Sequence, residues 1–326
     1  IEAIVNHPEK PTFGNTIVAM ERSGELLNRV AGVFYNLMGT DATPEMQEVA
    51  QRIQPKLTEL SNDISLNPAL FARVKAVYEH PGFGLSKVDK RLLEDTYKGF
   101  SRSGAALSEE DKELYRQYSN ELAALTLQFG QNALKATNAY TLNITDPKQV
   151  EELPDFVKEG LAAEAAARGE EGWTVTLDAP SYAPFMTYST QRDIKEALYR
   201  AYNTRGIGGE FDNTENIRRI AELRLNIANL LGYKCYADYV LEDRMAESTN
   251  TVNGFLNELN KATLSYAKRD VADVTAYAHS LGFEGELMPW DFSYYNEKYK
   301  EAMYSINDEQ IKPYLQLENV KNAVFM

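Results

Sequence analysis

The chain has 326 residues, of which 44% are hydrophobic and 25% charged, the proportions of an ordinary folded protein and not of a disordered one. Its 48 acidic side chains outnumber the 34 basic ones, and the net charge of −14 disfavours nucleic acid or an anionic membrane as a partner, since both attract excess Lys and Arg. No stretch reaches the roughly 18 uninterrupted apolar residues of a membrane span.

The first elements have the apolar spacing of amphipathic helices. Between residues 16 and 38, apolar side chains recur at three- and four-residue steps, which predicts one helix. Thr43 followed by Pro44 combines an N-cap residue with proline at the first helical position, and predicts a second helix start. Pro55 lies inside that second apolar run, so we expect it to kink the helix or to split it in two.

Two further helices follow before residue 105. Asn67 and Pro68 repeat the start signal. Ser86 with Asp89 predicts a capping box, and Gly104 is placed to end the helix that this box begins.

The next region contains the only strand signals. Ser108 with Asp111 predicts the start of another long helix. Residues 140–145 and 173–178 are β-branched and alternate with period two, so we expect them to pair as a ribbon around a helix near 148–168.

Helical patterns resume in the second half of the chain. The segment from Pro180 to Gly206 is predicted to be a loop that feeds a helix capped by Thr190 and Asp193. A glycine-rich turn at 206–209 precedes a further predicted helix, at 214–231.

The last patterns are also helical. A long helix is expected over 252–279, ended by Gly282, and the aromatic segment from Met288 onward is expected to be helical again. The resulting prediction is an all-α fold, one elongated multi-helix body over residues 1–326, with a small β-ribbon insertion near 140–178.

Candidate catalytic groups are scarce. A zinc peptidase needs two imidazoles one helical turn apart with a carboxylate between them, the motif His-Glu-x-x-His. The three histidines, His7, His80 and His279, lie far apart in the sequence and none belongs to such a motif. We therefore predict no catalytic residue, no metal ligand and no cofactor in this chain.

Nucleophilic and phosphate-binding chemistry is equally unsupported. Cys235 has no neighbouring histidine, and a lone cysteine is more often a small hydrophobe. No Gly-x-Ser-x-Gly elbow occurs. The turn at 206–209 follows a helix and lacks the Lys and Ser or Thr of a phosphate-binding loop, so a turn between helices is the favoured interpretation.

Tyrosines are abundant, with 20 in the chain. A tyrosine offers an apolar ring and a polar tip, which suits the wall of a peptide-binding cleft. The alternative is that these rings pack helix against helix. The candidate cleft or hinge residues are Tyr182, Tyr188, Arg192, Trp290, Asp291, Tyr294 and Tyr295.

A family resemblance emerges from the order of short motifs along the whole chain. The segment PSYAPFMTYSTQRDIKEALYRAYNTRG, from Pro180 to Gly206, resembles the zinc metallopeptidases of the thimet oligopeptidase, oligopeptidase A and peptidyl-dipeptidase family, with the peptidyl-dipeptidase branch nearest. Further similar pieces follow one another in the expected order, at residues 11–17, 21–24, 62–64, 100–105, 129–132, 230–233, 244–246, 288–291 and 311–314.

This resemblance implies a deep channel between two helical halves, with zinc bound in a half that follows the present sequence. The chain would then be the amino-terminal, non-catalytic half of a two-lobed peptidase that hydrolyses short peptides. It would form a cleft wall, with a hinge near residues 289–295 and the missing catalytic half as partner. The start without Met and the end inside an amphipathic run favour such a fragment, and predict an apolar patch near 317–326.

Two alternative functions stay open: a stand-alone helical module that binds peptides without chemistry, and a structural scaffold.

A single cysteine excludes an intrachain disulfide, so we expect a cytoplasmic protein. The periplasm is the alternative location.

Overall fold

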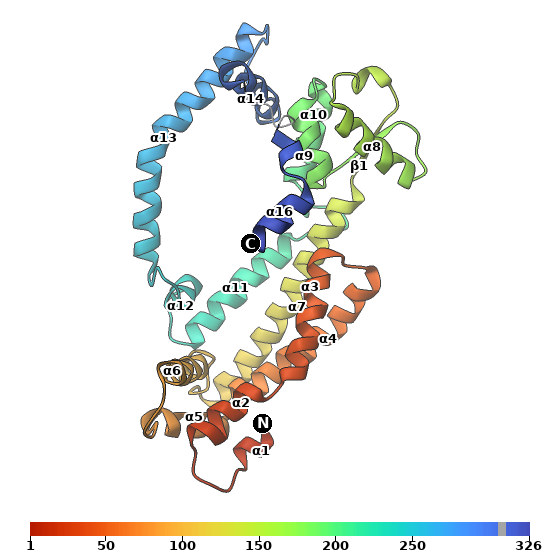
Figure 1. Cartoon of the computed structure of the whole chain (residues 1–326). Coiled ribbons are helices and arrows are strands. Elements are labelled where there is room, and N and C mark those ends of the chain that lie inside the picture. Colours follow the sequence, from red (N-terminus) through yellow and green to blue (C-terminus); the bar gives the residue numbers. More distant parts are fainter. Residues whose placement is uncertain (306–310) are drawn as a thin grey trace. The chain divides into compact units, whose positions relative to one another are not determined.

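The computed structural model describes residues 1–305 and 311–326. Helices account for most of these residues, and a two-stranded antiparallel sheet accompanies them, which confirms the predicted all-α class with a small β ribbon (Figure 1). None of the helices in these residues is long and apolar enough to cross a membrane.

The chain forms two compact units, each assembled from two separate stretches of sequence. Unit 1 comprises residues 1–132 and 212–252, and unit 2 comprises residues 133–211 and 253–326. The helices α7 (Glu109–Ala139) and α13 (Thr249–Ser280) each contribute to both units. The sequence patterns had not indicated this division, since both helices run through the unit boundaries without a break in their periodicity.

The predicted helix starts of unit 1 are confirmed. Helix α4 (Pro44–Ser65) begins where the Thr43 hydroxyl accepts a hydrogen bond from a backbone N–H, and α5 (Pro68–Glu79) begins in the same way at Asn67. Helix α6 (Lys87–Arg102) has the expected capping box between Ser86 and Asp89. These caps satisfy N–H groups that have no partner inside the helix, and each cap lies within four consecutive residues, so a short segment suffices to define each start.

One sequence prediction in unit 1 is wrong, and the expectation that Pro55 kinks or splits its helix is decided only against the split. Residues 16–38 do not form one helix: a π-helical turn (Phe13–Val18), α2 (Ala19–Arg22) and α3 (Glu25–Thr40) follow one another. The break falls at Gly24, whose φ of +79° is a left-handed conformation that glycine adopts without strain. Helix α4 is not split, because it continues through Pro55.

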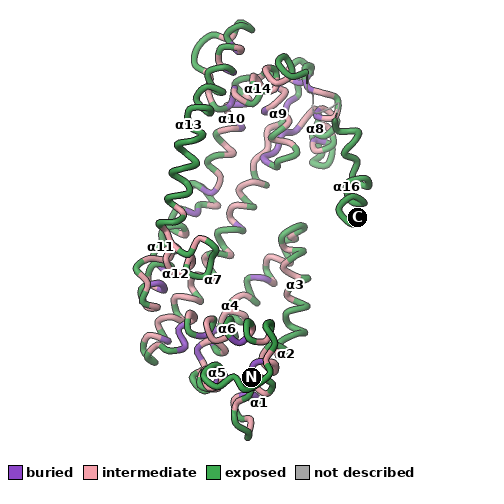
Figure 2. The backbone as a smooth tube through the Cα atoms, turned by 60° about the vertical axis from the view of Figure 1, so that its left-hand side comes forward, coloured by how far each residue is buried: buried purple, intermediate pink, exposed green. Residues whose placement is uncertain are grey.

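The core of unit 1 forms where the short α1 (Glu2–Val5) and the π-helical turn meet α5 and α6. Its buried apolar side chains are Ile4, Ile17, Leu70, Val74, Val77, Leu93, Phe100 and Ala105. Helix α3 contributes no buried residue, and most of it is exposed (Figure 2), including the side chains of Leu26, Leu27, Val30, Val33 and Leu37. Unit 1 also contains α11 (Thr214–Leu230) and α12 (Tyr236–Leu241).

Unit 2 is built around the β ribbon. Strands β1 (Thr141–Ile144) and β2 (Trp173–Thr176) pair antiparallel, as predicted, with Leu142 opposite Val175. A 3-10 turn (Pro147–Gln149) and α8 (Asp155–Ala167) connect them and occupy the place of the expected helix.

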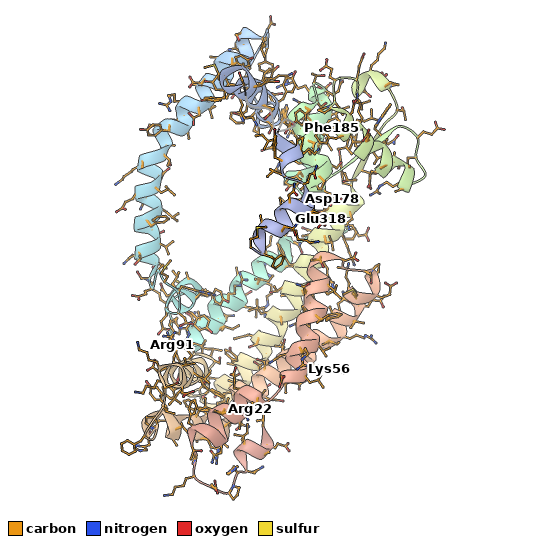
Figure 3. The ribbon with its side chains drawn as sticks, viewed as in Figure 1. Arg22, Lys56, Arg91, Asp178, Phe185 and Glu318 are labelled. Carbon is orange, nitrogen blue, oxygen red and sulfur yellow. The ribbon has the colours of Figure 1, made fainter. Side chains whose placement is uncertain are left out.

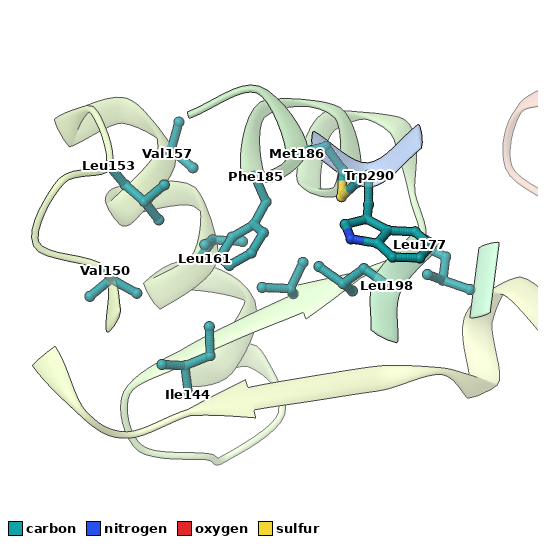
Figure 4. Close-up of a cluster of buried hydrophobic side chains, with 11 residues drawn as sticks. Ile144, Val150, Leu153, Val157, Leu161, Leu177, Phe185, Met186, Leu198 and Trp290 are labelled. Atoms are coloured by element: carbon teal, nitrogen blue, oxygen red, sulfur yellow. The ribbon is translucent and has the colours of Figure 1, made fainter. Parts of the chain in front are cut away.

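Helix α8 and the ribbon share a core with α9 (Ala179–Tyr188), α10 (Arg192–Asn203) and α14 (Pro289–Tyr304). Phe185 from α9 is fully buried beside Leu161, and Trp290 from α14 lies beside Leu198 and Met186 (Figure 4).

The end of the chain comprises a 3-10 turn (Lys312–Tyr314) and α16 (Leu317–Val324). Every residue from 311 to 326 is exposed. The exposed apolar side chains in the segment where the sequence predicts an apolar patch are Leu317, Val320, Val324, Phe325 and Met326.

Candidate functional site

The segment from Pro180 to Gly206, which carries the family resemblance, contains two helices. The predicted loop before the second helix is wrong, because residues 179–188 form α9; Figure 3 marks Phe185 in this helix and Asp178 just before it. Pro180 fits in the first turn of α9, because proline has no backbone N–H and an N–H at this position would have no partner inside the helix.

The predicted cap of α10 by Thr190 and Asp193 is also wrong. The N-cap residue is Gln191, whose side chain makes no cap hydrogen bond. Its backbone N–H donates to the Ser189 hydroxyl, a competing local bond that starts the helix one residue later than expected.

Helix α14, in unit 2, carries four of the candidate residues: Trp290, Asp291, Tyr294 and Tyr295. Pro289 occupies the first turn, and the carboxylate of Asp291 accepts a hydrogen bond of 3.0 Å from the Met288 backbone N–H. This bond satisfies one of the N–H groups at the helix start and holds Asp291 in a fixed orientation.

Arg192 at the start of α10 binds this same carboxylate. Its Nε lies 3.0 Å from Oδ1 of Asp291, and its Nη2 lies 3.0 Å from Oδ2, so the guanidinium contacts both oxygens. The Asp291 side chain is 2% exposed and that of Arg192 is 46% exposed. The hydrogen bonds to Asp291 raise the pKa of Arg192. A buried carboxylate is thus held between a helix start and a cation that faces solvent.

Lys195, one turn along α10, is a second cation beside this carboxylate. The residue is 2% exposed, and its Nζ lies 4.8 Å from the centroid of the Tyr294 ring. No hydrogen bond or ion pair joins it to the residues that the structure describes. Burial lowers the pKa of Lys195 to about 8; the charge of Asp291 opposes this change and that of Arg192 adds to it.

Aromatic rings surround the two cations. The Arg192 guanidinium carbon lies 5.6 Å from the Phe283 ring and 5.9 Å from that of Trp290. The guanidinium carbon of Arg200 also lies 5.2 Å from the Trp290 ring. The indole Nε1 is buried and has no hydrogen-bond partner within the described ranges.

The remaining candidate tyrosines fall into two groups. Tyr294 and Tyr295 pack edge to face at 5.1 Å within α14, beside the cations, and burial is the main cause that raises the pKa of both hydroxyls. Tyr182 instead stacks on Tyr202 at 4.3 Å, and Tyr188 meets Phe156 edge to face at 6.1 Å. These two rings pack helices together, the alternative reading of the tyrosine pattern.

Of the seven candidates, the structure therefore gathers five around the start of α14: Arg192, Trp290, Asp291, Tyr294 and Tyr295. Sequence reasoning missed Lys195 and Phe283. Lys195 did carry a signal, because it lies three residues before the buried Leu198 and therefore on the apolar face of α10.

Cavities lie elsewhere in both units. One in unit 1 has a volume of about 480 Å³ and is lined by the stacked rings of Tyr78 and Tyr97 and by Arg102. Unit 2 has one of about 280 Å³ beside α8 and another of about 390 Å³ beside the glycine-rich turn. None of the seven candidates lines any of these three cavities.

The histidines serve local structure. The Nδ1 of His7 accepts a hydrogen bond from the Glu9 backbone N–H, and Nε2 of His279 lies 3.1 Å from the Gly285 carbonyl oxygen. Within residues 1–305 and 311–326, no three His, Cys, Asp or Glu side chains gather as a metal ion would require. The described side chains therefore do not fit a catalytic zinc ion.

Comparison with known proteins identifies the family. The family described as Neurolysin/Thimet oligopeptidase, N-terminal domain, matches residues 1–112, and Peptidase family M3 matches residues 185–326. Oligopeptidase A of Salmonella typhimurium is 30% identical over 331 residues, which cover 100% of this chain and 49% of the relative.

Two other relatives agree. Dipeptidyl carboxypeptidase of Salmonella typhimurium is 34% identical and covers 98% of the chain, and the Probable cytosolic oligopeptidase A of Arabidopsis thaliana is 32% identical and covers 100%. The chain spans 48% of each of these two relatives, so it spans about half the length of the curated relatives it matches. Two family matches in order and relatives that align along the whole chain establish that it belongs to peptidase family M3, as its motifs had indicated.

Proposed function

We propose that this chain is the amino-terminal, non-catalytic part of a zinc metallopeptidase that hydrolyses short peptides, and that it forms a wall of the peptide-binding cleft. One observation carries the proposal. Family matches extend over the chain in the order of the family, and yet the sequence contains no His-Glu-x-x-His.

The family is one of zinc metallopeptidases, in which the metal polarises the scissile carbonyl and a glutamate takes a proton from the attacking water. The described residues do not fit the metal. We therefore assign zinc to the catalytic half of the parent protein, and no step of hydrolysis to the residues described here. That catalytic half and short peptides are the proposed partners.

An activity assay tests this assignment. The 326-residue chain, incubated with a mixture of fluorogenic short peptides and added zinc, should hydrolyse none of them. The parent protein that includes a His-Glu-x-x-His segment serves as the positive control. Hydrolysis by the 326-residue chain that a chelator abolishes and zinc restores would falsify the proposal.

We assign the residues around the start of α14 to the cleft wall and the hinge. The support is physical: Asp291 joins α10 to the first turn of α14 through bonds to Arg192 and Met288, so a movement of one helix is transmitted to the other. Aromatic rings with polar tips beside this joint suit contact with a peptide backbone.

Tryptophan fluorescence can test the cleft assignment. The chain has two tryptophans, Trp173 and Trp290, so Trp173→Phe leaves Trp290 as the only indole reporter. Short peptides at millimolar concentration should change the emission of this variant and release or absorb heat in calorimetry. An unchanged emission and no heat would remove these residues from the peptide-binding surface.

The same titration addresses the two alternatives. If the isolated chain binds peptides and no larger protein that contains it hydrolyses them, the chain is a stand-alone peptide-binding module. A chain that neither binds peptides nor belongs to an active parent would be a scaffold.

We also propose a cytoplasmic location, with the periplasm as the alternative. The name of the Arabidopsis relative, Probable cytosolic oligopeptidase A, and the single cysteine support it. Cell fractionation with an antibody against the chain tests this location, and recovery only in the periplasmic fraction would contradict it.

A further inference from the structure

The cavity of about 390 Å³ in unit 2 has features of a small-ligand site. It lies between the end of α7, helix α10 and the glycine-rich turn that follows α10. Small residues leave this space open, and they are Ala136, Ala139, Ala201, Gly206 and Gly208. Its volume is at the lower end of the range of known ligand pockets, roughly 300–1,000 Å³, and so suits a small molecule.

Arg205 supplies a fixed cation at the wall of this cavity. Its Nε donates to the Tyr202 carbonyl oxygen at 2.8 Å, and its Nη1 donates to the Thr137 hydroxyl at 3.0 Å. The guanidinium carbon also lies 3.7 Å from the centroid of the Tyr202 ring, which in turn stacks on Tyr182. These contacts fix the guanidinium plane in advance of any ligand.

This cation has no counterion among the residues that the structure describes. No carboxylate within the described part of the chain forms an ion pair with Arg205, and its Nη2 donates to none of the described residues. An arginine that is oriented by two hydrogen bonds and stacked on a ring, but whose charge is unpaired, is suited to receive a carboxylate.

The opposite charge and an apolar wall line the same cavity. Glu210 contributes a carboxylate that has no ion pair with the described residues, and it is therefore free to accept an ammonium group. Tyr140, Leu177 and Phe211 contribute apolar surface.

We propose that this cavity binds a small zwitterion with an apolar side chain, of the size of a free amino acid or a dipeptide. The carboxylate of the ligand binds Arg205, its ammonium binds Glu210, and its side chain covers the apolar wall. The site does not depend on zinc or on peptide hydrolysis, so it stands apart from the proposed function.

Nuclear magnetic resonance of the ¹⁵N-labelled chain tests the proposal with L-leucine and L-leucyl-L-leucine as probes. The amide signals of Gly206 and Gly208 should shift, with a dissociation constant on the order of 1 mM for the better probe. The probe that binds more tightly shows whether the ligand is a free amino acid or a dipeptide. N-acetyl-L-leucine lacks the ammonium and L-leucine amide lacks the carboxylate, so each should bind at least about fivefold more weakly than leucine.

Three variants test separately the contributions of the Glu210 carboxylate, the Arg205 guanidinium and the open space of the cavity to binding. Glu210→Gln should lower leucine affinity to that of N-acetyl-leucine and leave N-acetyl-leucine binding unchanged. Arg205→Lys keeps the charge but loses the planar fork, and should weaken leucine and N-acetyl-leucine about tenfold. Ala139→Leu at the end of α7 should fill the space and weaken every probe, whereas Ala124→Leu, on the same helix but outside the cavity, is the matched control.

Two results would overturn the proposal. One is that neither leucine nor leucyl-leucine shifts the two glycine signals at concentrations up to tens of millimolar. The other is that leucine amide binds as tightly as leucine, or that Ala139→Leu leaves binding unchanged. The Ala139 and Glu210 variants leave the hydrogen bonds of Arg205 intact, so they remain informative even where Arg205→Lys destabilises the fold.

Discussion

Each unit contains an arginine that binds one carboxylate and lies over two aromatic rings, but burial is distributed in opposite ways. In unit 1, Arg102 pairs with Glu242, and the arginine is 14% exposed while its partner is 48% exposed. In unit 2, it is the carboxylate of Asp291 that is buried, at 2%, and Arg192 that is 46% exposed.

The surroundings explain the difference. Arg102 has additional acceptors, because it also donates to the Tyr233 hydroxyl and the Tyr239 carbonyl oxygen, which are partly buried. Asp291 has one additional donor, the Met288 N–H, and a second cation nearby in Lys195. A buried charge is tolerated where the fold supplies partners for it, so the buried member of each pair determines what a mutation costs.

The largest effect is expected for Arg192→Ala. Breaking a fully buried ion pair costs about 3–5 kcal/mol. Because Arg192 is half exposed, we expect the substitution to lower the free energy of unfolding by about 3 kcal/mol. Denaturant unfolding measures this quantity. The matched control is Arg168→Ala at the end of α8 in the same unit, whose ion pair with Glu164 is solvent-accessible and should contribute less than about 1 kcal/mol.

Lys195 modifies that result, because it can act as counterion for Asp291 once Arg192 is removed. The cost of Arg192→Ala should therefore be larger in a Lys195→Met background. Equal costs in the two backgrounds would show that the two cations do not share the carboxylate.

Lys195→Met should itself stabilise the protein at pH 7, by about 2 kcal/mol, since a buried lysine that forms no hydrogen bond or ion pair with the described residues is replaced by an apolar side chain of similar length. The pKa of Lys195 is lowered in the folded state from 10.5 to about 8. Between these values the unfolded chain binds more protons than the folded one, so this group makes stability rise with pH from about 8 to 10.5.

Unfolding at pH 7, 8.5 and 10 measures that dependence. The gain from Lys195→Met should be largest at pH 7 and shrink toward pH 10, where the wild-type amine is neutral in the folded protein. A gain that stays constant over this range would mean that Lys195 is neutral or paired throughout.

A smaller effect is expected in unit 1 for Glu242→Ala. Arg102 keeps its bonds to Tyr233 and Tyr239, and Glu242 is half exposed, so the loss should be about 1 kcal/mol in denaturant unfolding. Asp243→Asn, which breaks the exposed ion pair with Lys98, is the control and should cost less than about 0.5 kcal/mol. A cost for Glu242→Ala above that of Arg192→Ala would reverse the comparison between the units.

The smallest effect is expected for Trp290→Phe. The indole Nε1 has no hydrogen-bond partner within the described ranges, so its removal relieves a penalty that offsets part of the lost packing. We expect a net change below about 1 kcal/mol in thermal or denaturant unfolding. A cost of several kcal/mol would indicate that Nε1 does have a partner, such as a bound water molecule.

Local features of the fold could be predicted from the sequence, because their interactions join residues three or four apart. The Ser86 and Asp89 capping box is one example. The β ribbon differs: alternation with period two predicted each strand, although the paired residues of β1 and β2 lie far apart in the sequence. The predictions for residues 16–38 and for the cap of α10 were wrong because other local interactions competed: a left-handed Gly24 ended one helix, and Ser189 displaced the expected cap of the other.

The candidate site could also be predicted only in part. Family motifs indicated Arg192, Asp291 and Trp290 as individual residues, but that Arg192 binds Asp291 could not be read from the chain, because 99 residues separate them. The burial of Lys195 and the unpaired charge of Arg205 likewise depend on which side chains the fold brings near.

The sequence by itself determined the helical class, most helix starts, the β ribbon and membership in family M3, since these follow from local hydrogen bonds, apolar periodicity and the order of motifs. Only the tertiary structure decided which charge in each ion pair is buried, and that Arg205 and Glu210 line one cavity. The physical reason is that burial and charge pairing are set by distant segments that meet on folding, and a one-dimensional pattern does not record those meetings.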